Sequence, residues 1–196
     1  MLRQRGDTLK KVISAGLLGG VVLIVWTFIV NGIFGFQANI DMKQVPAERQ
    51  IYEVLRQHII DPGRYVFNPE LTPEGHTPGK EPVFSVLYGG MGHDSAGGLM
   101  MVGLVVFFLA PMIGAWLLSQ TSVRVRSSYP RKILFFSAIG FLLALFSDLA
   151  KYGIGRYPVN DALAFAANDI VAWILVGLVV GWRIQPPGVD SIRRVS

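Results

Sequence analysis

Long apolar runs separated by polar segments dominate the chain. Runs of low charge, each long enough to cross a hydrocarbon core of ~30 Å, occupy residues 12–36, 97–118 and 162–182, and a shorter one occupies 133–150. The polar segments are residues 1–11, 37–96, 119–132, 151–161 and 183–196. The pattern predicts an all-α membrane protein, a bundle of four transmembrane helices with one large loop between the first two.

The large loop, residues 37–96, has a pattern of its own. Val45-Pro46-Ala47-Glu48 predicts a helix that begins with proline in its first turn and runs to about Ile59. Residues 64–67 and 83–88 predict two short strands, with proline and glycine turns between them. A segment with one helix and two strands is too small to fold alone, so we expect an α+β segment that lies as a lid on the outer ends of the spans or on another protein.

Composition supports a membrane location, and the placement of charge predicts the topology. The 196 residues are 52% hydrophobic and 16% charged, with a formal net charge of +5. Eleven of the 18 basic residues lie in residues 1–11, 119–132 and 183–196. Because basic loops stay on the cytoplasmic side, we expect these segments inside and residues 37–96 in the periplasm of a bacterial inner membrane. This explanation accounts for the positive charge without nucleic-acid binding, and the expected partner is the lipid bilayer.

Cofactor chemistry is not indicated. The chain has no cysteine, which excludes disulfides, thiolate metal sites and CxxC redox motifs. All three histidines lie in the large loop, so no histidine within the bundle can ligate haem or a chlorophyll-type magnesium. We therefore predict no cofactor and no metal.

The last span carries a carboxylate. An ionisable side chain in a spanning helix costs at least ~2.5 kcal/mol, so Asp169 should face protein or water and not lipid. Steps of three and four residues from Asp169 trace one helix face, made of Ala162, Ala166, Trp173, Gly177 and Gly181. Small residues at this spacing let helices approach closely, and the first span repeats the feature at Gly16 and Gly20.

Several polar residues share the depth of Asp169 in the outer half of the predicted bundle. They are Asn31, Asp148, Lys151, Asn168 and Asp169 itself. Asp148 and Lys151 stand three apart on one helix face and can pair. The group is either a polar pocket that binds a proton or cation, with Lys151 as the charge partner of Asp169, or a hydrogen-bonded knot that fixes helix rotation.

A glycine-rich stretch, residues 89–98, leads into the second span. Its backbone N–H groups could cradle an anion, with Gly92, His93 and Asp94 as the candidate residues. The alternative is that the glycines only let the chain bend while Asp94 or Ser95 caps the helix. No GK[ST] follows, so the stretch is not a nucleotide-binding P-loop.

Residues 46–51, 62–69 and 168–173 together resemble uncharacterised bacterial four-span inner-membrane proteins with a helix-plus-strands first periplasmic loop. This resemblance implies location and architecture and no chemistry. The sequence favours a non-catalytic accessory or scaffold subunit that associates with other membrane subunits or with itself. The alternative is a small transporter or ligand-binding protein that uses the pocket around Asp169. An envelope or lipid-modifying enzyme acting through His93 and Asp94 is a third candidate.

Overall fold

The structure, a computed structural model, describes residues 2–69, 79–92 and 96–185. It divides into two compact units, which we describe separately. The helical unit comprises Met1–Lys43 and Met101–Ser196, and the loop unit comprises Gln44–Met100.

Four helices within the described residues are long and apolar enough to cross a membrane. The first is α1 (Leu2–Phe28), which continues as the π-helix η1 (Ile29–Ile33), and the second is α3 (Ala96–Gln120). The third runs from α5 (Tyr129–Leu143) through the π-helix η4 (Ala144–Leu149) into α6 (Ala150–Gly153). The fourth is α7 (Val159–Arg183). These helices confirm the predicted class of an all-α membrane protein.

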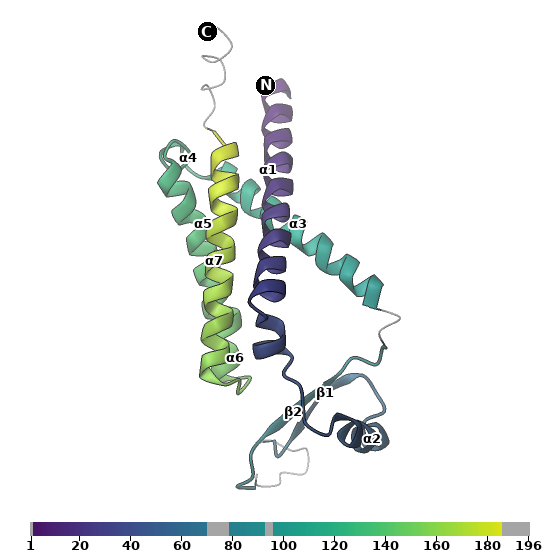
Figure 1. Ribbon diagram of the computed structural model, residues 1–196. Helices are drawn as coiled ribbons and strands as arrows, with labels where there is room; N and C mark the ends of the chain where they lie inside the picture. Colours follow the sequence, from purple (N-terminus) through teal and green to yellow (C-terminus); the bar gives the residue numbers. More distant parts are fainter. Residues whose placement is uncertain (1, 70–78, 93–95, 186–196) are drawn as a thin grey trace. The chain divides into compact units, whose positions relative to one another are not determined.

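The helix α7 lies between α1 and α5 and packs against both (Figure 1). The glycine-containing face predicted from the sequence meets α5, where Trp173 stacks on Phe136 with ring centroids 6.0 Å apart. A methyl group at Gly177 would lie 2.7 Å from Cβ of Phe136, so only glycine fits there. A second face of α7, which the sequence analysis did not identify, meets α1 through Val176 and Val180.

The helix α3 does not run alongside the other three but crosses α1 obliquely (Figure 1). The predicted small residues of α1 form this crossing, since Gly16 meets Met112 and Gly20 meets Phe108. Before Phe108 the side chains of α3 are mostly exposed, and no other atom would lie within 4 Å of a methyl group at Gly103. The expected bundle is thus regular for three helices only, because α3 is apolar on every side and has no polar residue that fixes its position.

The buried core of the helical unit lies where these contacts converge. Phe136 and Leu118 are fully buried, and the other members of the core are Val12, Ala15, Ala115, Val176, Val180 and Ile184. Two short helical segments, η2 (Gln37–Asp41) and α4 (Val123–Arg126), flank the long helices. The core therefore lies toward the end of the unit that carries both the N-terminal half of α1 and the C-terminal half of α7.

The loop unit contains the helix and the two strands that its pattern predicts. They are α2 (Glu48–His58), β1 (Gly63–Phe67) and β2 (Phe84–Tyr88). The strands pair antiparallel in a register that runs from Gly63 opposite Tyr88 to Phe67 opposite Phe84. Pro46 is not in the first turn as expected, because Ala47 adopts a left-handed conformation (φ 59°) immediately before the helix.

Candidate functional site

The third span contains a half-buried ion pair. Nζ of Lys151, on α6, lies 2.9 Å from Oδ1 of Asp148, on η4. Asp148 is only 2% exposed, whereas 39% of the Lys151 side chain is exposed. The structure thus confirms the pairing that the spacing of three residues predicted. The Asp148 carboxylate is the buried partner, and the Lys151 ammonium is the more exposed one.

The fourth span adds a second carboxyl group to this pair. Asp169 on α7 faces Asp148 within hydrogen-bonding range, and it also interacts electrostatically with Lys151. The side-chain amide of the adjacent Asn168 donates a long hydrogen bond of 3.4 Å to Oδ1 of Asp169. Four of the five polar residues predicted to share a depth are therefore in one group, and they come from two spans.

The first span joins the group through a residue that the sequence analysis did not identify. Nε1 of Trp26 on α1 donates a hydrogen bond of 2.9 Å to Oδ1 of Asn168. The sequence offered one signal for this contact, because an indole N–H in the middle of a spanning segment needs an acceptor. We call Trp26, Asp148, Lys151, Asn168 and Asp169 the polar cluster.

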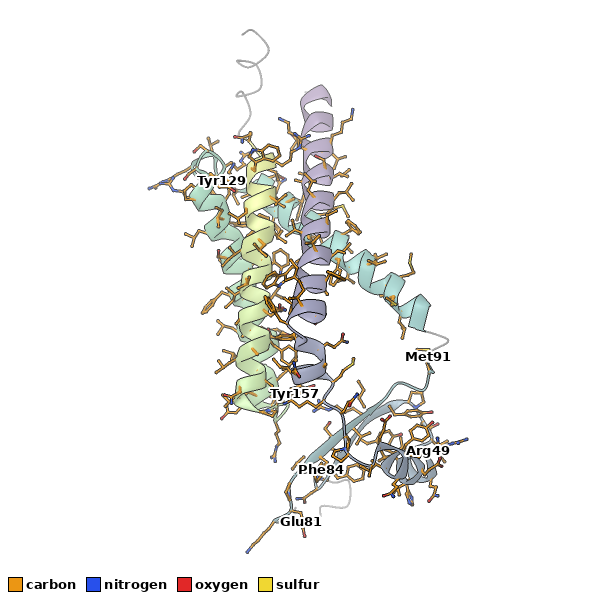
Figure 2. All side chains as sticks on the ribbon, in the orientation of Figure 1. Arg49, Glu81, Phe84, Met91, Tyr129 and Tyr157 are labelled. Atoms are coloured by element: carbon orange, nitrogen blue, oxygen red, sulfur yellow. The ribbon has the colours of Figure 1, made fainter. Side chains whose placement is uncertain are left out.

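Aromatic rings cover one side of the polar cluster. Nζ of Lys151 lies 4.7 Å from the centroid of the Phe165 ring, a cation–π distance. The Phe165 ring in turn makes edge contacts with Phe36 and Tyr157. Figure 2 shows Tyr157 near the end of the helical unit opposite Tyr129. The polar cluster is therefore in the N-terminal half of α7.

One buried side-chain atom of the polar cluster lacks a hydrogen bond. Oδ2 of Asp148 is buried, and no donor in the described part of the chain reaches it. A buried acceptor without a donor costs about 1–3 kcal/mol, so it calls for an explanation. The group that faces this carboxyl is Asp169, which can donate only if it carries a proton.

A second ion pair lies at the same end of α7. Nζ of Lys43 lies 2.8 Å from Oδ2 of Asp161, in the first turn of α7. Pro158 occupies the cap position of α7, and no side chain caps this helix. The opposite charges of Lys43 and Asp161 cancel, so this pair adds no net charge beside the polar cluster.

Two other groups of candidate residues do not join the polar cluster. Asn31 lies on η1, and no hydrogen bond links it to the polar cluster within the described ranges. Gly92 is exposed in the loop unit, whereas His93 and Asp94 lie outside the described residues, as does Ser95. The candidate anion-binding stretch thus has no described geometry.

At the opposite end of the helical unit, Lys132 is only 2% exposed. The sequence placed it in the loop before the third span, but α5 already begins at Tyr129. Nζ of Lys132 donates a hydrogen bond of 2.8 Å to the carbonyl oxygen of Ile184, just after α7 ends. A cation at a helix C-terminus interacts favourably with the helix dipole, so this contact anchors the end of α7 to α5.

In the described residues no group of three or more histidine, cysteine, aspartate or glutamate side chains could hold a metal ion. The polar cluster brings ionisable side chains of the third and fourth spans together. Comparisons with protein-family models, with curated proteins and with solved structures found no match to this chain.

Proposed function

We propose that the four apolar helices cross a bacterial inner membrane with both chain termini on the cytoplasmic side. The support is the basic excess in residues 1–11, 119–132 and 183–196, together with the mixed charge of residues 37–96. In this arrangement the polar cluster lies in the periplasmic half of the spans, and Lys132 lies near the cytoplasmic end.

We further propose that the protein is non-catalytic and acts by association, as an accessory or scaffold subunit of a membrane assembly. The observation that carries this proposal is the first half of α3, where Met101, Val102 and Val105 are exposed and Gly103 has open space beside it. Small residues in spanning helices are typical of helix–helix contacts, since they allow close approach of a partner. The proposed occupant is a membrane helix of another subunit or of a second copy.

Purification from native membranes in mild detergent tests this proposal. The protein should co-elute with a partner or as an oligomer, and Gly103→Leu should weaken that association by filling the open space. Leu134→Phe, on an exposed position of α5, is the matched control and should leave association unchanged. A wild-type protein that elutes as a monomer without partners would overturn the proposal.

The second candidate function is a small transporter or ligand-binding protein that uses the polar cluster. The observation that favours it is the convergence of Asp148, Asp169 and Lys151 from different spans, because ionisable residues within membranes often mark ion or proton paths. Proteoliposomes containing wild type or Asp169→Asn provide the test. Flux that is present in wild type and lost in the variant is expected, and absence of flux from both rejects transport.

A further inference from the structure

We propose that Asp148 and Asp169 share one exchangeable proton, so that the polar cluster is a proton-binding site. This inference deepens the second candidate function and rests on the same residues. It concerns binding at equilibrium, however, and therefore does not require that the protein transports anything.

The first argument comes from hydrogen bonding. Oδ1 of Asp148 accepts from Lys151, while Oδ2 is buried and has no donor among the described residues. The carboxyl group of Asp169 faces it from α7. Two ionised carboxylates in contact repel each other and leave Oδ2 unsatisfied. One proton between them turns the same contact into a hydrogen bond.

The second argument comes from charge. The ionisable groups that face each other are Asp148 on η4, Lys151 on α6 and Asp169 on α7, and α1 contributes only the neutral indole of Trp26. Two carboxylates and one ammonium leave a net charge of −1 inside a spanning region. Because an uncompensated charge there is costly, binding of one proton neutralises the cluster.

The third argument separates a proton from a metal cation. Asn168 presents its NH₂ group to Asp169, since its carbonyl oxygen already accepts from Trp26. The ammonium of Lys151 occupies the other side of the Asp148 carboxylate. A sodium ion needs several oxygen ligands, whereas here N–H donors and a positive charge adjoin the carboxyl pair. This donor set suits two carboxyl groups that share a proton.

Infrared difference spectroscopy of the purified full-length protein in lipid nanodiscs tests the proposal. A pH titration of wild type should show one protonated-carboxyl C=O band that shifts in D₂O and disappears in a single step. Asp148→Asn and Asp169→Asn should each abolish this band and its titration step. Asp161→Asn, which alters the separate ion pair with Lys43, is the control and should retain both.

Two results would overturn the proposal. One is a wild-type spectrum with no band that either variant removes. The other is a wild-type band that sodium displaces at constant pH while choline does not, since this would identify the ligand as a metal cation. Measurements on wild type alone decide the second point, so it holds even if a variant fails to fold. A protein that shows the band and no flux retains the proton site and loses only the transport function.

Discussion

The indole Nε1 of Trp26 and the side-chain oxygen of Asn168 are joined by a hydrogen bond of 2.9 Å, although 142 residues separate them in the sequence. This bond connects the first span to the last. It also fixes the orientation of the Asn168 amide, so that the NH₂ group faces Asp169. A residue of α1 thereby positions the donor beside the carboxyl pair.

Trp26→Phe should destabilise the helical unit by about 0.6–1 kcal/mol, because it removes this interhelical hydrogen bond and keeps most of the aromatic volume. Unfolding of the purified protein in mixed micelles measures the change. Trp116→Phe, at a position that is 52% exposed, is the control and should be nearly neutral. Equal losses in the two variants would contradict the assigned role of Trp26.

Lys151→Met should destabilise the protein by about 2 kcal/mol, because it leaves the buried carboxylate of Asp148 without its partner. The value is below that of a fully buried pair, since the lysine is partly exposed. The double variant Asp148→Asn/Lys151→Met should recover much of the loss. The same micelle unfolding assay measures all three proteins.

Lys43→Met serves as the comparison for the lysine prediction. It breaks the pair with Asp161, in which 55% of the Lys43 side chain is exposed. Exposed pairs contribute about 0–1 kcal/mol, so this variant should cost less than Lys151→Met. An equal loss in the free energy of unfolding for Lys43→Met and Lys151→Met would contradict this prediction.

Gly140→Ala should destabilise the packing of α5 on α7 by about 1–3 kcal/mol. A methyl group there would lie 2.9 Å from Cβ of Trp173 and 3.1 Å from Cα of Ile170, so the helices would have to move apart. Gly153→Ala is the matched control, since its methyl group would meet nothing within 4 Å. Thermal unfolding of both variants should show a loss at residue 140 and none at residue 153.

The proposed topology predicts opposite accessibility for residues 80 and 127. The chain contains no cysteine, so single substitutions give unambiguous labels. A membrane-impermeant maleimide should label Lys80→Cys in spheroplasts and should label Ser127→Cys only after the membrane is disrupted. Labelling of both positions in intact spheroplasts would show that the proposed threading is wrong.

The sequence was sufficient for features set by neighbouring residues. The four apolar helices follow from runs of hydrophobic residues, which need no tertiary information. The pair of Asp148 and Lys151 follows from a spacing of three on one helix. The short strands follow from β-rich runs bounded by turn residues.

Features that depend on the rotation and tilt of helices were not predictable. Depth placed Asn31 with Asp148 and Asp169, but depth does not say which way a side chain points around its helix, and Asn31 does not join the other two. For the same reason the contact of Trp26 with Asn168 was not predictable from the sequence. The oblique course of α3 was also hidden, because a helix that is apolar on all sides has no face that predicts its neighbours.

The π-helical segment Ala144–Leu149 implies that the third span is unequally sensitive to deletions at different positions. A π turn holds more residues than an α turn, so removal of one codon within this segment restores a plain α-helix. The residues that follow would keep their orientation, because the deletion removes only the surplus residue. A deletion of one codon in α5 would instead rotate every later residue by ~100°, so that Asp148 and Lys151 would turn away from Asp169.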